Sequence, residues 1–242
     1  MPFLLALSAL AGCCAGCASL PPGSIRDPHD HFERFNRAMF KFDMALDRRV
    51  MRPLARTYVR ATPAPVRTGI SNFLGNLAYT TTVTNDILQG KPKDFVKDLA
   101  RLIVNTTIGI GGFLDPATHL GLLKHDRDFG QTLGKWGLHT GPYLVLPLLG
   151  PSDVRDAFGT LADRFTTVDA YVDDTAATSG LFSMRALDTR ANALPEDATL
   201  DSAFDPYAFV RSAWFQERAF KVHGDRPDEL PNLPEPDSNT RK

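Results

Sequence analysis

The stretch that decides the fold is "FGQTLGKWGLHTGPYLVLPLLGPSDVRD", residues 129–156, in which glycines and prolines surround an apolar centre. Residues 142–149 carry no charge. Water disfavours an exposed run of this kind, whereas a helix that spans a bilayer needs about twenty apolar residues without such breaks. Because Pro142 and Pro147 exclude a regular helix, the sequence predicts an extended or re-entrant segment over residues 140–149.

An amphipathic helix is predicted near the start of the chain. Asp27 and Pro28 are typical of a helix N-cap and a first helical position, and the pattern ends before Pro53. Between them, apolar residues recur every three or four positions, and charged residues occupy most of the other face. The apolar stripe fits two interpretations, packing against the core or contact with acyl chains. It consists of Phe32, Phe35, Met39, Phe42, Leu46 and Val50.

Further helices are predicted along the chain, with prolines or capping residues at their starts and glycines at several ends. No run of alternating residues is long enough to predict a sheet, so the predicted fold class is all-α. Short irregular segments rich in Gly and Pro interrupt it. In one of them Gly109, Gly111 and Gly112 permit sharp turning or close backbone approach. The predicted helices start near Pro63 or Pro65 and run to residue 77, then cover residues 80–88, 92–109, 128–137, 153–165 with Ser152 as N-cap, 167–188, and 206–224 after Asp205.

Residues 1–20 contain no charge and have the organisation of an export signal, with an apolar region at residues 3–10 followed by small residues. The motif "LAGC", residues 10–13, resembles the bacterial lipobox, where a signal peptidase cuts before a cysteine that carries a diacylglycerol. Cys13 is the first candidate for lipidation and Cys17 the alternative. A plain signal peptide or a transmembrane anchor fits less well, because the apolar stretch is short and ends in cysteine.

The chain is thus predicted to consist of a lipoprotein signal peptide (residues 1–12), a lipidated tether (13–26), one helical domain (27–224) and a disordered tail (225–242). All three cysteines lie within the first 17 residues, so disulfides do not hold the body together. The 27 basic and 28 acidic residues are interspersed, which excludes a basic stripe for nucleic acid.

Catalytic and metal-binding motifs are incomplete in this sequence. The nucleophile elbow Gly-x-Ser-x-Gly is half met around Ser71 and around Ser152, and both copies lack the second glycine. His29 and His31 form the one close histidine pair, at a helix start where neighbouring side chains diverge. The sequence therefore predicts a protein that is no enzyme and uses no cofactor or metal. An envelope phospholipase that uses Ser71 or Ser152 is an alternative.

Several long, ordered stretches resemble the MlaA (VacJ) family of outer-membrane lipoproteins, over about residues 27–218. His29 and Asp30 depart from the Leu-Glu that is usual at this helix start in the family. The resemblance implies an all-α, ring-like body embedded in the inner leaflet of a Gram-negative outer membrane, with an amphipathic central channel. The stretches are "DPHDHFERFNRAMFKFD", "NFLGNL", "VNTTIGIGGFLDPA", "DFGQTLGKWGLHTGPYLVLPLLGPSDVRD" and "DPYAFVRSAWFQER".

The resemblance also implies a function and partners. Family members associate with porin trimers and pass mislocalised outer-leaflet phospholipid to a soluble periplasmic carrier, without catalysis. A phospholipid is half apolar and half charged, so its conduit needs an apolar wall for the acyl chains and polar partners for the headgroup. Irregular backbone is tolerated where it lines a water-filled cavity. A scaffold that holds a porin without passing lipid is the alternative. The candidate channel residues are Gly141, Pro142, Tyr143, Leu144, Val145, Leu146, Pro147, Leu148 and Leu149, with Gly109, Gly111, Gly112 and Phe113 expected nearby.

Overall fold

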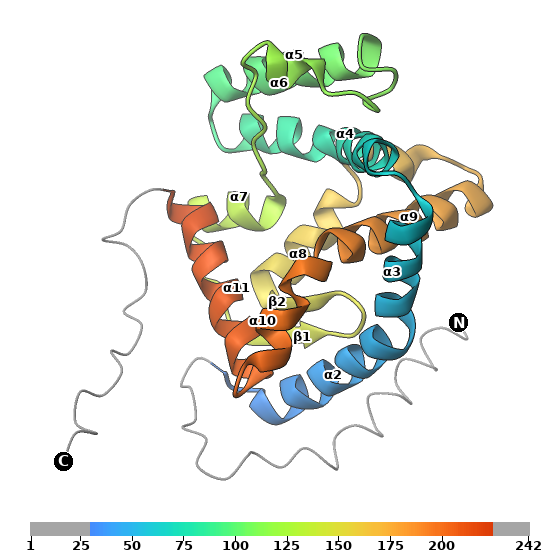
Figure 1. Ribbon diagram of the computed structural model, residues 1–242. Helices are drawn as coiled ribbons and strands as arrows, with labels where there is room; N and C mark the ends of the chain where they lie inside the picture. The colour runs from blue at the N-terminus through green and yellow to red at the C-terminus, as the bar shows by residue number, and fades with distance from the viewer. Residues whose placement is uncertain (1–29, 225–242) are drawn as a thin grey trace, which may run out of the picture.

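A computed structural model describes residues 30–224 of the chain, and most of them are helical (Figure 1). The helical fold class predicted from the sequence is confirmed. In chain order the elements are α2 (Glu33–Leu46), the π-helical turn η1 (Asp47–Met51), α3 (Arg52–Ala61), α4 (Ala64–Leu88), α5 (Pro92–Thr107), α6 (Pro116–His119), α7 (Phe129–Lys135), β1 (Tyr143–Leu146), β2 (Gly150–Asp153), α8 (Val154–Asp163), the 3-10 helix η2 (Val168–Tyr171), α9 (Thr175–Asn192), the 3-10 helix η3 (Leu194–Glu196), α10 (Asp197–Ser202) and α11 (Pro206–His223).

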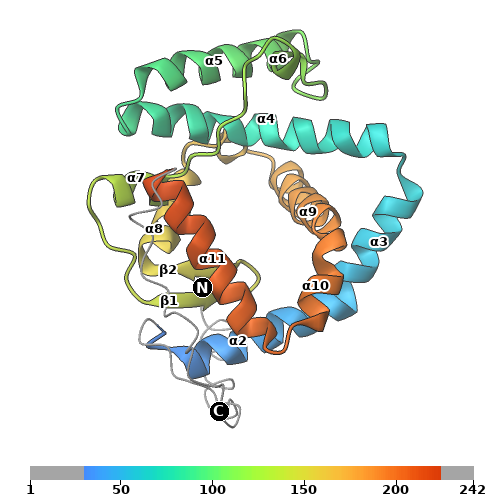
Figure 2. The ribbon, with the colours of Figure 1, turned by 60° about the vertical axis from the view of Figure 1, so that its left-hand side comes forward.

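The helices are arranged around a common centre. Helices α2, α3 and α4 follow three sides of a ring, and α7, α8 and α11 occupy the remaining side (Figure 2). Helix α9 packs on α3 and α4, while α5 and α6 form an outer layer on the far side of α4 (Figure 1). The turn between β1 and β2 lies on the inner side of this ring in both views.

The expectation that the fold contains no sheet is wrong. Strands β1 and β2 form an antiparallel hairpin in which Tyr143 pairs with Asp153 and Leu146 with Gly150. Proline is tolerated at the edges of a strand. Pro142 and Pro147 therefore flank the four-residue strand β1 instead of interrupting it, and the extended backbone predicted for this segment is present.

Proline and cap signals located several helix starts, whereas packing moved other boundaries. Helix α5 begins at Pro92 and α11 follows Asp205 as expected, while Asp128, predicted as the first residue of a helix, is the N-cap of α7. The first predicted helix does not end before Pro53, because η1 joins α2 to α3 without a break. Pro53 lies in the first turn of α3, where a missing N–H costs little. Likewise, α4 is one continuous helix instead of two.

Two further boundaries differ from the prediction. The N-cap of α8 is Asp153, whose carboxylate accepts the backbone N–H of Asp156 at 2.6 Å, while Ser152 belongs to β2. The helix predicted over residues 167–188 is divided, because η2 ends at Tyr171 and Asp174 caps α9. The predicted cap at Asp27, the lipidation candidates and the predicted tail lie outside the described residues.

The interior of the described region is mainly polar. Buried polar and charged residues outnumber buried apolar ones among residues 30–224, and eight arginines with largely buried side chains pair there with aspartates. A buried charge is tolerated only when it is paired. Except for Arg155 and Asp156, which are neighbours in α8, these eight pairs join separate segments of the chain. They are Arg37–Asp205, Arg52–Asp201, Arg101–Asp115, Arg127–Asp86, Arg155–Asp156, Arg190–Asp47, Arg211–Asp30 and Arg218–Asp128.

Large apolar side chains lie on the outside instead. Two groups stand out, one on the α5–α6 layer and one along α8 and η2. In α2 only part of the predicted stripe is buried, since Met39 is in the core while Phe32 is exposed and Glu33 is buried. None of the helices within the described residues is long and apolar enough to cross a membrane. The two groups are Val96, Ile103, Ile108, Ile110, Phe113, Leu114, Leu120 and Leu123, and Val154, Phe158, Leu161, Phe165, Val168, Tyr171 and Val172.

Candidate functional site

The β1–β2 hairpin divides the candidate channel residues into a buried and an exposed set. Tyr143 is 0% exposed and Val145 is 1% exposed, and both belong to a core cluster with Met39 and Tyr207. The structure thus places Tyr143 and Val145 in the core and not at an opening. The turn after β1 is different, because Leu148 and Leu149 are 69% and 62% exposed.

Asn36 of α2 holds the hairpin in place. Its Nδ2 donates to the carbonyl of Tyr143 at 3.0 Å and to Oδ1 of Asp30 at 2.8 Å, while the N–H of Val145 donates to its Oδ1 at 2.9 Å. Asn36 therefore completes the backbone hydrogen bonds on the open edge of β1. Sequence reasoning missed this residue. The available signal was a polar residue four positions after Phe32, within the apolar stripe.

Replacing Asn36 with leucine is expected to loosen the hairpin. The substitution leaves a buried N–H and a buried carbonyl of β1 without partners, which costs about 1–3 kcal/mol for each group. Chemical denaturation of the two proteins measures this loss. The matched control is Asn72→Leu, since Asn72 makes one longer, exposed bond to the Phe113 carbonyl at 3.4 Å. Equal stability of the two variants would show that Asn36 does not anchor the hairpin.

The hairpin tip combines apolar exposure with a constrained backbone. Leu148 has a φ of 68°, and its N–H donates to Oδ1 of Asp43 in α2 at 2.9 Å. Burial raises the pKa of Asp43, and the hydrogen bond from Leu148 opposes this effect. The carbonyl of Leu146 accepts the N–H of Leu149 at 3.2 Å. The two leucines are thus held exposed in the turn between β1 and β2, and this turn lies on the inner side of the ring of helices (Figure 2).

The glycine-rich turn after α5 lies elsewhere. Gly112 rests on α4 so closely that a Cβ there would lie 2.3 Å from the Cβ of Asn76, whose Nδ2 donates to the carbonyl of Gly111 at 3.3 Å. This turn belongs to the outer α5–α6 layer, and α4 separates it from the hairpin (Figure 1). The expectation that residues 109–113 lie near the hairpin is therefore wrong, because close packing on α4 fixes them on its far side.

The two turns nevertheless share one property. Leu148 and Ile110 are the non-glycine residues with positive φ among residues 30–224, and Ile110, like Leu148, is largely exposed, at 73%. Such a conformation costs about 1–3 kcal/mol and persists where the surroundings enforce it, often at functional sites. Both turns thus present an apolar side chain from a strained backbone.

A buried acidic cluster fixes the segment between α6 and α7. Asp86 and Asp98 are fully buried. Nδ1 of His125 lies 2.8 Å from Asp98, the hydroxyl of Tyr79 donates to Asp98 at 2.9 Å, and Nε of Arg127 lies 2.5 Å from Asp86. Burial, followed by the hydrogen bond and charge of Asp98, raises the pKa of Asp86 to about 7. Its contacts run between neighbouring elements, so this cluster stabilises the fold.

The serines considered as nucleophiles are engaged in structural hydrogen bonds. The hydroxyl of Ser71 donates to the carboxylate of Asp188 at 2.7 Å, and that of Ser152 donates to the carbonyl of Asp153 at 3.2 Å. Within the described part of the chain, neither hydroxyl bonds to a histidine, the usual general base of an activated serine. Residues 30–224 contain no group of three or more His, Cys, Asp or Glu side chains that could hold a metal ion.

Known proteins resemble the chain over nearly its whole length. It is 37% identical to the intermembrane phospholipid transport system lipoprotein MlaA of Escherichia coli over 238 residues, which cover 94% of each chain. The protein of the same name from Haemophilus influenzae is 32% identical over 229 residues, covering 91% of this chain and 88% of the relative. An uncharacterized protein of Rickettsia bellii is 34% identical over 199 residues, 81% of this chain and 78% of the relative.

A solved structure has the same fold. It is described as "Structural basis for maintenance of bacterial outer membrane lipid asymmetry", and it superposes with a TM-score of 0.73 at 35% identity, covering 81% of this chain and all of that one. The family described as MlaA lipoprotein matches residues 28–221. The chain, whose hairpin is held by Asn36 within a polar interior, thus belongs to the MlaA lipoprotein family.

Proposed function

We propose that the protein removes mislocalised phospholipid from the outer leaflet of the outer membrane through an amphipathic channel and passes it to a soluble periplasmic carrier. This transfer maintains the lipid asymmetry of the membrane. The relatives named as phospholipid transport lipoproteins and the structure concerned with lipid asymmetry support this role.

One observation carries the proposal, the inverted distribution of side chains. The α5–α6 layer and α8–η2 each expose several large apolar side chains, and the described region buries many charged groups, which water-soluble proteins do sparingly. Both features suit a body surrounded by acyl chains, where exposed apolar groups meet lipid and the polar groups face inward. The ion pairs then hold the ring of helices together alongside the small apolar cluster around Tyr143.

The hairpin tip is the part of the ring proposed to meet the cargo. A phospholipid presents acyl chains and a charged headgroup at once, so its path needs apolar and polar surfaces side by side. The exposed Leu148 and Leu149 offer the apolar surface, and the half-buried carboxylate of Asp43, which accepts the N–H of Leu148 at 2.9 Å, lies beside them. The turn's irregular backbone is tolerable where it lines a water-filled cavity.

Attachment to the membrane is proposed to come from lipid on Cys13, with Cys17 as the alternative. Two or three acyl chains hold a protein firmly, so no spanning helix is required. In this arrangement the protein sits on the periplasmic side of the outer membrane beside a porin trimer, and catalysis plays no part. Lipid then moves down its own free-energy gradient, or the carrier draws it by tighter binding.

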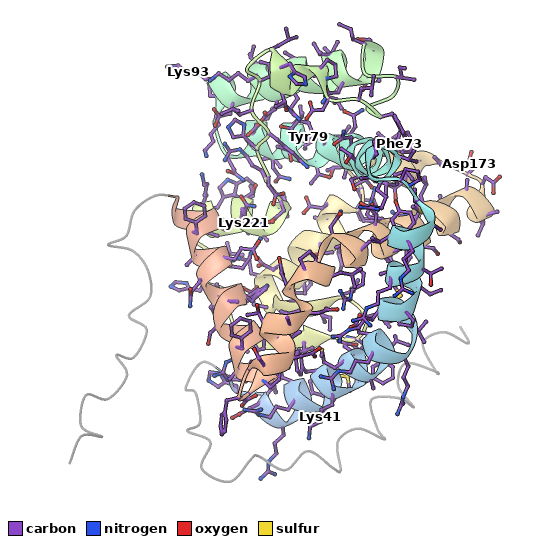
Figure 3. All side chains as sticks on the ribbon, viewed as in Figure 1. Lys41, Phe73, Tyr79, Lys93, Asp173 and Lys221 are labelled. Carbon is purple, nitrogen blue, oxygen red and sulfur yellow. The ribbon has the colours of Figure 1, made fainter. Side chains whose placement is uncertain are left out.

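Surface phospholipid in cells tests this function. Deletion is expected to increase the phospholipid that an added phospholipase releases from intact cells, and the wild-type chain is expected to restore the low level. Leu148→Asp with Leu149→Asp should fail to restore it, whereas Lys41→Asp, on the outer side of α2, should succeed (Figure 3). A protein that only scaffolds a porin would leave surface phospholipid unchanged on deletion, and that result would overturn the proposal.

A further inference from the structure

A cluster of lysines lies at the corner where α4 turns into α5. A shallow, open depression of about 320 Å³ lies there, lined by Lys91, Pro92, Lys93 and Asp94. Lys93 extends from this corner at the edge of the molecule, away from α2 and its Lys41 (Figure 3). Lys135, the last residue of α7, brings a third ammonium group close to that of Lys91.

The positive charge at this corner is not neutralised within the structure. Among residues 30–224, no carboxylate lies within 4.0 Å of the ammonium groups of Lys91, Lys93 or Lys135. The nearby Asp94 is held by Arg127 at 2.6 Å. Partial burial, followed by the neighbouring Lys91, lowers the pKa of Lys135 to about 8. Such crowding of cations is relieved when an anion binds between them.

An apolar surface adjoins the lysines. The indole of Trp136 is exposed, and its Nε1–H donates to the carbonyl of Leu88 at 3.1 Å, which fixes the ring against the end of α4. Ile87, Leu88 and Leu138 are exposed beside it. Tryptophan and lysine together are typical of the depth at which a bilayer passes from acyl chains to headgroups.

We propose that this corner is a headgroup site, in which Lys91, Lys93 and Lys135 bind the phosphate of a phospholipid while its acyl chains lie along Trp136 and Leu138. The inference rests on the proposed function and adds the chemistry by which lipid is recognised. Ammonium groups form strong charge-assisted hydrogen bonds with phosphate oxygens, and the neighbouring apolar patch excludes water from them. Inorganic phosphate offers the same anion without the chains, so the two sources can be separated.

Calorimetric titration of the mature, full-length protein in an uncharged amphipol tests the site. The probes are dihexanoylphosphatidylglycerol below its micelle concentration, dihexanoylglycerol, which has the same chains without phosphate, and inorganic phosphate. The phospholipid is expected to bind at least tenfold more tightly than either of the others. The triple variant Lys91→Gln, Lys93→Gln, Lys135→Gln should lose at least tenfold in that affinity, and the exposed single variant Lys93→Gln should lose part of it. Lys41→Gln, an exposed lysine at the far end of the molecule, should bind like the wild type.

Three results would overturn the headgroup site: unchanged phospholipid binding in the lysine variants, equally tight binding of dihexanoylglycerol, or equally tight binding of inorganic phosphate. The surface-phospholipid assay separates this failure from failure of the proposed function. If the wild-type chain restores lipid asymmetry but the lysine variants bind phospholipid as tightly as the wild type, the headgroup site alone is disproved. A chain whose binding depends on the lysines but which fails to restore asymmetry disproves the transport role alone.

Discussion

Replacing Arg218 with methionine is expected to lower the free energy of unfolding by about 3–5 kcal/mol, the usual cost of removing one partner from a buried ion pair. Arg218 of α11 reaches Asp128, the N-cap of α7, at 2.6 Å and Asp156 of α8 at 2.5 Å, and its side chain is largely buried. Methionine fills similar space but leaves Asp128 without its cation and Asp156 paired with Arg155 alone. Denaturant unfolding monitored by circular dichroism measures the loss.

The same substitution has a predictable pH dependence. Burial raises the pKa of Asp128, but the hydrogen bonds and charge of Arg218 more than offset this, so the folded pKa lies below the usual range. A depressed carboxyl pKa stabilises the fold above the unfolded value of about 4, and this stabilisation is lost as the pH falls towards the folded value. The difference in the free energy of unfolding between the wild type and Arg218→Met should therefore become smaller below about pH 4.

Arg49→Met is the matched control for Arg218. Arg49 is exposed and forms no ion pair within the described part of the chain, so its replacement should change stability by no more than about 0.5 kcal/mol. If Arg218→Met were as stable as Arg49→Met, the ion pairs would not join the helices, and the account of a polar interior would fail.

Replacing Gly159 with alanine is expected to cost about 3 kcal/mol, at the upper end for overpacking. A Cβ at Gly159 in α8 would lie 2.4 Å from the nitrogen and 2.7 Å from the Cα of Gly130 in α7. Both contacts involve backbone atoms, so α7 and α8 must separate to make room. The melting temperature of the purified variant measures the effect.

Gly180→Ala is the same substitution, but it is expected to have the opposite effect on stability. A Cβ at Gly180 meets nothing within 4 Å, and the residue lies inside α9, where alanine is favoured over glycine by about 0.5–1 kcal/mol. This variant should be slightly more stable than the wild type. Equal loss of stability in Gly159→Ala and Gly180→Ala would contradict the close packing of α7 on α8.

Local signals in the sequence predicted much of the helical fold. A proline or capping residue followed by an apolar pattern located α5 and α11, because caps and prolines act within one helical turn. The short helix predicted over residues 128–137 corresponds to α7. The hairpin was not predictable in this way. Its strands are four residues long, and only pairing with each other and with Asn36 makes them strands.

The polar interior could not be read from the sequence either. Interspersed charges are ordinarily solvated, yet Arg218 and Asp128 meet across 90 positions and Arg37 and Asp205 across 168. No local pattern encodes such partners. For the candidate site, the uncharged run coincides with the hairpin, but only the fold shows that Tyr143 is core and that Leu148 and Leu149 are exposed.

The most direct test of the central claim is photocrosslinking of phospholipid to the hairpin tip in living cells. A photoreactive residue at Leu148 or Leu149 is compared with one at Lys41, which points away from the body on the outer side of α2 (Figure 3). A lipid path along the inner side of the ring predicts phospholipid adducts at Leu148 and Leu149 and none at Lys41. Adducts at Lys41 with none at the hairpin tip would contradict it.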